Sequence, residues 1–360
     1  MFFHATTYSV TLVSLTIIAL GYFFYLSNQK SYPLVLQPIA TTTIITTTAT
    51  ATSSPDTLFP ATTSTEIIPA AATPVNTQGT RTTAASVIAG MHLTFEDNFN
   101  TLNRYLDTKG NITCEPGGIG TWQTVYHFCS RTIPSNHEAE IYTDQNFLDY
   151  LHQSTGNTTT ATSPFTLKNG TLSIEAKPAD AAITKAAGPW AKYTSGLITT
   201  QFSFAQQYGY FEMRAQMPAG SGLWPAFWLL PVDKSWPPEI DVMEAFGDKN
   251  SKGEGGRTAI HYASHTVQKS GLCGEWYDVG VDITKGFHTY GVNWQKDTIT
   301  YFFDGVAYAT CPGNPDANQP FYLLVNLAVG STASWPGSPN ASNVWPVYMN
   351  VDYVRAYQTN

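Results

Sequence analysis

The chain has 360 residues, of which 12% are charged and 13% are aromatic, and its formal net charge at pH 7 is −8. The few basic residues form no patch along the sequence, which excludes a nucleic-acid-binding protein. Low charge combined with many aromatic residues is typical of a secreted protein with a carbohydrate-facing surface.

An apolar run lies near the start of the chain, from about Val10 to Leu26. Its length fits either the apolar region of a signal peptide or a short membrane span. Met1 to Tyr8 contains no Lys or Arg, and no Ala-x-Ala cleavage site follows promptly, so an uncleaved anchor is favoured. We therefore assign residues 1–30 to a signal peptide or membrane anchor.

Residues 31–89 are dominated by Thr, Ser, Ala and Pro and carry almost no charge, as in Thr41-Thr-Thr-Ile-Ile-Thr-Thr-Thr-Ala-Thr50. The segment lacks an aromatic pattern on which to build a core, which predicts a disordered stalk, open to O-glycosylation. A Thr-rich array of strands is the alternative. Asn-x-Ser/Thr sites occur at Asn111, Asn157, Asn169 and Asn340. About four such sites are expected by chance in a chain this rich in Ser and Thr, so they do not establish N-glycosylation.

From residue 90 to residue 360 the sequence pattern is different and consists of short runs in which apolar and polar residues alternate. Examples are Thr171-Leu-Ser-Ile-Glu-Ala176 and Thr298-Ile-Thr-Tyr-Phe-Phe303. Gly, Pro, Asn and Asp separate the runs, and no long helical period occurs. This pattern predicts an all-β sandwich or barrel that forms one domain.

Four cysteines, Cys114, Cys129, Cys273 and Cys311, all lie in this domain, and none has C-x-x-C spacing. Disulfides fit this spacing better than metal ligation or catalysis. Of the three possible connectivities we predict Cys114–Cys129 with Cys273–Cys311, on proximity alone, and expect each bond to staple a loop rather than the core. Disulfides favour an extracellular protein, either secreted or anchored at the cell surface.

Three carboxylates interrupt an apolar, strand-like run, Trp236-Pro-Pro-Glu-Ile-Asp-Val-Met-Glu-Ala-Phe-Gly247. Alternate side chains of a strand share a face, so Glu239 and Asp241 point the same way. A regular strand would bury Glu244 in the core, where an unpaired carboxylate costs several kcal/mol. We therefore predict a β-bulge near Val242-Met243, which returns Glu244 to the face of the other two acids.

Aromatic-rich strands precede the acids, notably Tyr208-Gly-Tyr-Phe-Glu-Met-Arg-Ala215 and Gly222-Leu-Trp-Pro-Ala-Phe-Trp-Leu-Leu230. The succession resembles glycoside hydrolase family 16, whose members carry an E-x-D-x-x-E strand after a G-x-W-P-A-F-W strand. Further matching segments extend the resemblance over about residues 91 to 360: Tyr193–Gly196, His261-Tyr262, Phe287–Trp294, Phe303–Gly305, Tyr322–Gly330 and Val351–Tyr357. Lys192–Thr200 and Pro237–Asp241 look most like endoglycanases that cut succinoglycan-type polysaccharides.

The resemblance implies a β-jelly-roll sandwich whose concave sheet forms the substrate cleft. It also implies that Glu239 is the nucleophile, Glu244 the general acid/base and Asp241 an assisting acid. Physical chemistry agrees, because crowding by neighbouring carboxyls raises the pKa of at least one of them. A retaining glycosidase needs its two carboxyl groups about 5–5.5 Å apart. The alternative is three exposed acids on a solvated strand.

Three tryptophans are candidate sugar platforms, because the C–H-rich faces of sugars pack on indole rings. Trp224 and Trp228 share one face of their strand, and Trp236 lies in the loop before the acids. Trp294, in an apolar strand, is expected in the core. For loop tryptophans such as Trp335, the sequence does not decide between the cleft and the core.

Five further side chains are candidates for the cleft. Asn136, Glu138 and Glu140 resemble the family's N-x-E-x-Q-x-Y strand, but Glu140 stands where Gln is commoner, which puts its contact in doubt. Arg214 either hydrogen-bonds sugar hydroxyls or pairs with a carboxylate. His261 either contacts the acid/base or substrate, or is a packed histidine.

No cofactor is expected for catalysis, since no His, Cys and Asp cluster has catalytic-metal spacing. The family often carries a structural calcium, to which Asp352 would correspond. The sequence thus predicts a monomeric, retaining endo-β-glycosidase that cuts β-1,3 or β-1,4 linkages of a glucan-like polysaccharide. The rivals are a transglycosylase on the same fold and a non-catalytic carbohydrate-binding lectin.

Overall fold

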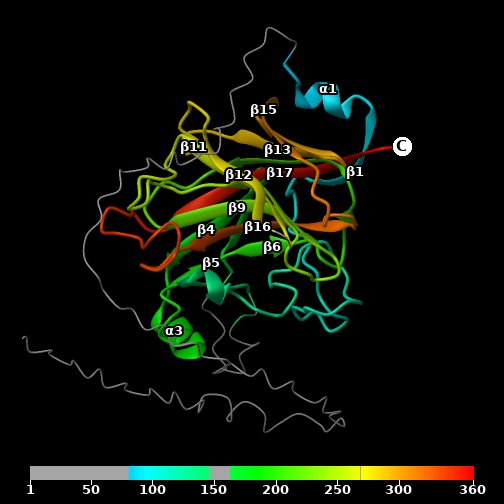
Figure 1. Cartoon of the computed structure of the whole chain (residues 1–360). Helices are drawn as coiled ribbons and strands as arrows, with labels where there is room; N and C mark the ends of the chain where they lie inside the picture. The colour runs from blue at the N-terminus through cyan, green and yellow to red at the C-terminus, as the bar shows by residue number, and fades with distance from the viewer. Residues whose placement is uncertain (1–80, 146, 148–162, 268) are drawn as a thin grey trace, which may run out of the picture. The chain divides into compact units, whose positions relative to one another are not determined.

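A computed structural model describes residues 81–145, 147, 163–267 and 269–360 (Figure 1). The chain divides into two units, Met1–Pro74 and Val75–Asn360. The first unit lies outside the described residues, and with it the expected signal or anchor and most of the expected stalk. Among the helices that can be described, none combines the length and the apolar character needed to cross a membrane.

The described strands form two sheets. The ten-stranded sheet has the order β15 (Val306–Pro312), β14 (Thr298–Phe303), β13 (His288–Trp294), β8 (Gly209–Gln216), β17 (Val347–Thr359), β4 (Thr171–Pro178), β5 (Tyr193–Ser195) and β2 (Glu140–Tyr142), with β1 (Met91–Asp97) on β17 and β3 (Phe165–Lys168) on β4. The seven-stranded sheet has the order β12 (Lys269–Asp278), β11 (Ala259–Thr266), β10 (Glu239–Glu244), β9 (Leu223–Pro231), β16 (Phe321–Val329) and β6 (Leu197–Thr199), with β7 (Ala205–Gln206) on β16.

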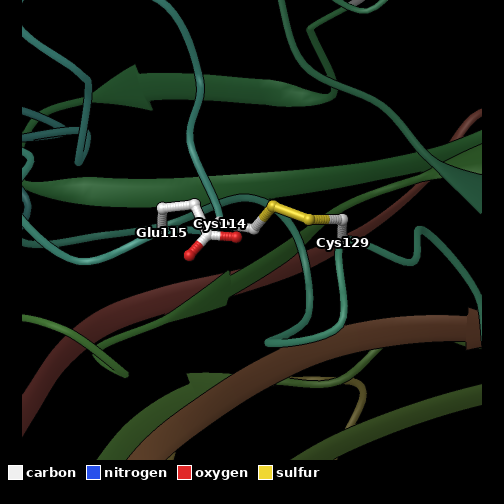
Figure 2. Close-up of side chains that lie close together, drawn as sticks. All are labelled: Cys114, Glu115 and Cys129. Carbon is white, nitrogen blue, oxygen red and sulfur yellow. A yellow bond between two sulfur atoms is a disulfide. The ribbon is translucent and has the colours of Figure 1, made fainter. Parts of the chain in front are cut away.

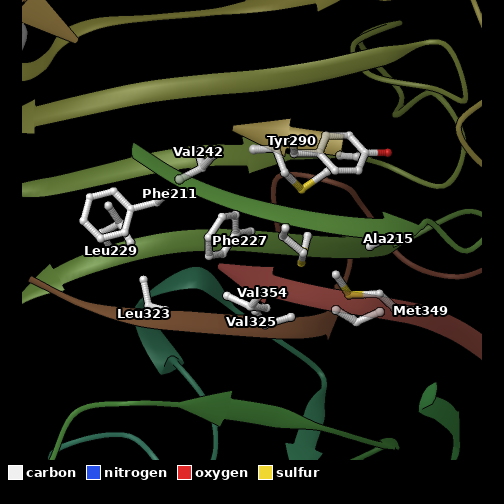
Figure 3. Close-up of a cluster of buried hydrophobic side chains, with 14 of the residues drawn as sticks. Phe211, Ala215, Phe227, Leu229, Val242, Tyr290, Leu323, Val325, Met349 and Val354 are labelled. Carbon is white, nitrogen blue, oxygen red and sulfur yellow. The ribbon is translucent and has the colours of Figure 1, made fainter. Parts of the chain in front are cut away.

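The core lies between the two sheets (Figure 3). Phe227 and Leu229 of β9 and Val325 of β16 face the core from the seven-stranded sheet, while Phe211 of β8 and Val354 of β17 face it from the other; all five are fully buried. Burial of each such side chain contributes about 1.5–3 kcal/mol. The predicted all-β sandwich is therefore confirmed. Because strand side chains alternate, the other face of β9 and β16 is free to carry a site.

Within the described residues three short helices can be delimited, and they lie outside the sheets: α1 (Ala84–Ile88), η1 (Pro134–Asn136) and α3 (Ala181–Ala187). Helix α1 begins at a capping box, in which Thr83 and Ser86 exchange side-chain to backbone hydrogen bonds. Ala84 is buried in a small cluster with Tyr210 and Phe302. The folded unit thus includes residues that the sequence assigned to the stalk, because the short helix is capped and packed on β8 and β14.

Both predicted disulfides are present. Cys114 and Cys129 are joined within one loop region, with their Cα atoms 5.4 Å apart (Figure 2). Cys273 and Cys311 are joined with their Cα atoms 6.0 Å apart. The expectation that each bond staples a loop is wrong for this second pair, since it links β12 to β15, strands of different sheets, and Cys311 is 3% exposed.

Candidate active site

Strand β10 carries the three acids on one face because its pairing with β9 contains a bulge. Asp241 lies opposite Trp228, whereas Met243 lies opposite Phe227, so Val242 is the additional residue. Val242 and Met243 are both buried on the core side, with 1% and 0% of their surfaces exposed. The predicted bulge is therefore confirmed.

The three acids line a cleft of about 730 Å³ on the outer face of the seven-stranded sheet. The side chains that line it come from β9, β10, β11, β16 and three loops. They include the following residues: Tyr126, His127, Phe128, Asn136, Glu138, Trp224, Trp228, Lys234, Trp236, Glu239, Asp241, Glu244, His261, His265, Tyr322, Asn326 and Trp335. A cleft with an aromatic lining and a few convergent polar groups is the usual form of a ligand site.

Glu239 is the first acid of β10 and is partly open to the cleft. Its Oε2 accepts a hydrogen bond of 2.6 Å from Trp236 Nε1. Burial raises the pKa of Glu239 well above its usual value, and the charge of Asp241 and a hydrogen bond with it act in the same direction. The charge of His265 and the Trp236 N–H oppose this pKa rise.

Asp241 lies between the other two acids and is 3% exposed. Its Oδ2 is 2.9 Å from His265 Nε2. Burial, and then the charge of Glu244, raise the pKa of Asp241 well above its usual value, while the hydrogen bond with Glu239 lowers it. The carboxyl groups of Glu239 and Asp241 therefore each influence the pKa of the other.

Glu244 is held by two partners on neighbouring strands. Trp224 Nε1 donates to its Oε1 at 2.9 Å, and His261 Nδ1 lies 2.9 Å from its Oε2. The expected contact between His261 and the third acid is therefore present. The two bonds fix the position of this carboxyl group in the cleft.

The three candidate tryptophans all line the cleft. Trp228 Nε1 donates to Asn326 Oδ1 at 2.7 Å, which holds the buried indole against the sheet. Trp236 is 67% exposed and so presents its ring to solvent. Trp294, expected in the core, is fully buried there.

The segment from Asn136 to Glu140 lies at the cleft wall, but it is not the single strand that the resemblance implied, since Asn136 ends η1 and only Glu140 lies in β2. Asn136 and Glu138 line the cleft, and Asn136 Nδ2 donates to Glu138 Oε1 at 3.1 Å. Glu140 is fully buried behind them, and its Oε2 accepts from the Val329 N–H at 2.7 Å. Burial, followed by the charge of Glu138, raises the pKa of Glu140 well above its usual value.

Arg214 and Asp352 are not part of the cleft, so of the two alternatives for Arg214 the pairing with a carboxylate is confirmed and the contact with sugar hydroxyls is not. Both lie on the ten-stranded sheet, on β8 and β17, where Arg214 Nη1 forms an ion pair with Asp352 Oδ2. The guanidinium also lies 5.0 Å from the ring centre of Phe287. The sequence alone could not decide between the two alternatives, because it does not show to which sheet the strand of Arg214 belongs.

The surroundings of Asp352 do not fit the expected calcium site, because its carboxylate already pairs with a guanidinium. Within the described parts of the chain, two clusters bring three potential metal ligands together, and neither contains Asp352. One is Cys114, Glu115 and Cys129, whose sulfurs form a disulfide and so supply no thiolate (Figure 2). The other is Glu239, Asp241 and His265.

Several cleft residues were not assigned to the cleft from the sequence, among them Trp335, which was left undecided, and His265, which was not considered. Trp335 packs edge-on against His261, with ring centres 4.9 Å apart, and against Trp224 at 5.6 Å. It lies in the loop after β16, where no strand pattern indicates direction. His265 also escaped notice, although it lies four residues after His261 on β11 and therefore on the same face.

Comparisons with known proteins agree with this geometry. The family model for glycosyl hydrolases family 16 matches residues 151–355. The chain is 38% identical over 268 residues to "Endo-1,3-1,4-beta-glycanase ExsH" of Rhizobium meliloti, an alignment that covers 73% of this chain and 51% of ExsH. This chain therefore spans about half the length of that relative.

Solved structures share the fold. The laminarinase catalytic domain of Thermotoga maritima superposes with a TM-score of 0.54 and 26% identity, covering 74% of this chain and 98% of that domain. SCLam, described as a non-specific endo-β-1,3(4)-glucanase, superposes with a TM-score of 0.57 and 28% identity, covering 76% of this chain and 93% of SCLam. The predicted jelly-roll sandwich is thereby confirmed, and the chain belongs to glycosyl hydrolases family 16.

Proposed function

We propose that this protein hydrolyses internal β-1,3 or β-1,4 linkages of a glucan-like polysaccharide with retention of configuration. One observation carries the proposal: a bulge at Val242 brings Glu239, Asp241 and Glu244 to one face of β10, inside a tryptophan-lined cleft. Two carboxyl groups that flank a sugar-binding surface are the machinery of glycoside hydrolysis.

In the first step Glu239 attacks the anomeric carbon and forms an ester with it. The glycosidic C–O bond breaks, and Glu244 gives its proton to the departing oxygen. The indole N–H of Trp224 and the ring of His261 hold Glu244 in place for this transfer. Asp241, hydrogen-bonded to Glu239, helps to divide charge and protons between the two carboxyls.

In the second step water attacks the anomeric carbon from the side that the leaving group vacated. Glu244, now ionised, takes a proton from this water, and the ester bond to Glu239 breaks. Esterification has removed the charge of Glu239 at this stage, which favours the ionised form of Glu244. Two inversions at one carbon give net retention.

The substrate class is supported by the relatives together with the cleft. ExsH is named an endo-1,3-1,4-β-glycanase and SCLam an endo-β-1,3(4)-glucanase. Trp224, Trp228 and Trp236 offer flat surfaces of the kind that pack against glucose rings. Within this class, succinoglycan-type polymers are a candidate alongside laminarin and mixed-linkage glucans.

We also propose that the protein acts outside the cytoplasm, either secreted or anchored at the cell surface. A polysaccharide is an extracellular substrate, and two disulfides persist best in an oxidising environment.

The test is reducing-end release by the full-length chain from laminarin, mixed-linkage β-glucan, succinoglycan and agarose, with product sizes recorded. Short internal fragments are expected from a glucose-based polymer. Glu239→Gln should abolish turnover while binding remains, and the matched control Glu175→Gln, on β4 of the other sheet, should keep full activity.

Two outcomes would replace the proposal. Products longer than the substrate would indicate a transglycosylase, in which a sugar takes the place of water. Binding without hydrolysis on all four polymers would indicate a lectin.

A further inference from the structure

A second hollow adjoins the cleft that holds the three acids. Its volume is about 770 Å³, and the side chain of Glu138 lines both spaces. Its walls come from the segment 132–139, which leads into β2, the segment 190–193 at the start of β5, and the loop 330–339 after β16. The three acids of β10 do not line it. The second hollow is therefore next to the catalytic cleft but separate from the reacting carboxyl groups.

Trp190 and Lys192 both line the second hollow. Ala191, between them, is fully buried in a small apolar cluster around Phe147. Because Ala191 is turned inward, its two neighbours are turned toward solvent, and Trp190 is accordingly 42% exposed and Lys192 exposed. The Lys192 N–H donates to the Ala139 carbonyl at 2.9 Å, which fixes the segment. An indole and an ammonium are thus presented side by side.

The exposed charge in the second hollow is the Lys192 ammonium. Across the described ranges this lysine forms no ion pair. The acid in the lining, Glu138, is turned inward, where it accepts from the Ile133 N–H at 2.9 Å and from Asn136 Nδ2 at 3.1 Å. Burial raises the pKa of Glu138 and so favours its neutral form. An anion in the hollow therefore meets a free positive charge and little negative charge.

The loop after β16 adds hydroxyl groups. Ser331, Thr332 and Ser338 line the second hollow. The loop is held in place because Ser331 Oγ donates to the His137 carbonyl at 2.6 Å. An indole, an ammonium and hydroxyls around one space suit a sugar ring that carries a negative charge. Its C–H face packs on the indole, its hydroxyls find hydrogen-bond partners, and its anion pairs with the ammonium.

We propose that the second hollow binds an anionic sugar residue, one with a carboxylate or a sulfate ester, of the same polysaccharide whose linkage is cut at the three acids. Trp190 packs against the sugar ring, and the Lys192 ammonium pairs with the negative group. Because Glu138 borders both spaces, a polysaccharide in the cleft reaches the second hollow along that side chain. This inference rests on the proposed function and deepens it, since it adds charged residues to the substrate class.

The first experiment measures kcat and KM of the full-length wild type, Lys192→Gln and the control Lys296→Gln. The substrates are laminarin, laminarin partly oxidised at C6 to the carboxylate, and sulfated laminarin. Lys296 is also exposed, but it lies between β13 and β14 of the other sheet.

Lys192→Gln should raise KM about two- to fivefold on an anionic polymer, since an exposed ion pair is weak. Its kcat, and its KM on laminarin, should not change. At about 1 M salt, where the Debye length falls to about 3 Å, the difference should disappear. Lys296→Gln should match the wild type throughout. A response with one anionic polymer alone identifies the substituent as carboxylate or sulfate.

Two results overturn the proposal. One is an unchanged KM of Lys192→Gln on both anionic polymers. The other is an equal rise of KM on laminarin, because the loss would then not depend on the charge of the ligand. Trp190→Ala tests the indole: it should raise KM on the anionic polymer about two- to tenfold, and an unchanged KM would also refute the site.

A second experiment separates this inference from the proposed function. Calorimetry measures the binding of oxidised and sulfated laminarin to Glu239→Gln, alone and combined with Lys192→Gln. Affinity should fall about two- to fivefold in the double variant. If it falls although the wild type cleaves no polymer, the proposed function fails and the site stands. If the wild type cleaves laminarin but affinity for both anionic polymers is unchanged, the site is refuted and the function stands.

Discussion

Replacing Glu140 by glutamine should make the protein more stable at neutral pH. Glu140 is fully buried, and its Oε1 has no hydrogen-bond donor among the described residues to stabilise a negative charge. Its stable form is therefore the protonated acid, whose O–H can donate a hydrogen bond to Glu138. Glutamine has the same shape, still accepts from the Val329 N–H through its carbonyl, and presents an N–H to Glu138.

The magnitude follows from proton linkage. Burial and the Glu138 charge raise the pKa of Glu140 in the folded state above the unfolded value of 4.5. Above pH 4.5 the unfolded chain releases this proton and the folded protein keeps it, so the free energy of unfolding falls as pH rises. The slope from one such group is at most about 1.4 kcal/mol per pH unit, or about 2.7 kcal/mol between pH 5 and pH 7.

The assay is urea unfolding at pH 5, 6 and 7 for the wild type, Glu140→Gln and the exposed control Glu115→Gln. The advantage of Glu140→Gln over the wild type should grow with pH, up to about 2.7 kcal/mol across this range. Glu115→Gln should run parallel to the wild type. If Glu140→Gln also runs parallel to it, Glu140 is ionised in the folded protein and the reasoning is refuted.

Two further changes test other contacts. Trp224→Phe keeps an aromatic ring but removes the N–H that donates to Glu244, and since a hydrogen bond to a charged group contributes about 1.5–3 kcal/mol, kcat/KM should fall by about 10- to 100-fold. A change of less than about twofold would mean that this bond does not position the acid. Replacing Cys273 and Cys311 by alanine opens a link across 38 residues, which should lower the free energy of unfolding by about 4 kcal/mol in urea titrations. An unchanged urea midpoint of unfolding would show that the disulfide does not contribute to the stability of the two packed sheets.

Local physical rules were sufficient for the strand that carries the acids. The cost of burying Glu244 requires a bulge, and the structure has one at Val242. Strand periodicity likewise placed Trp224 and Trp228 on one face. Each of these inferences needs only residues that are close in sequence.

The errors and omissions concern contacts between distant segments. Arg214 faces outward as its strand pattern requires, but β8 belongs to the sheet without the cleft, and this depends on the strand order. His265 reaches Asp241 only because the register of β11 against β10 places His265 opposite Glu239, two residues before Asp241. Trp335 lies in a loop, where neither period 2 nor period 3.6 applies.

The central claim is double displacement by Glu239 and Glu244, and the stereochemistry of the first product tests it most directly. Proton NMR during the first minutes of cleavage of a β-glucan distinguishes the anomers of the new reducing end. The β-anomer should appear first and convert to the mixture only later by mutarotation, because two displacements restore the configuration. Initial release of the α-anomer would mean a single displacement by water, and would contradict the covalent role of Glu239.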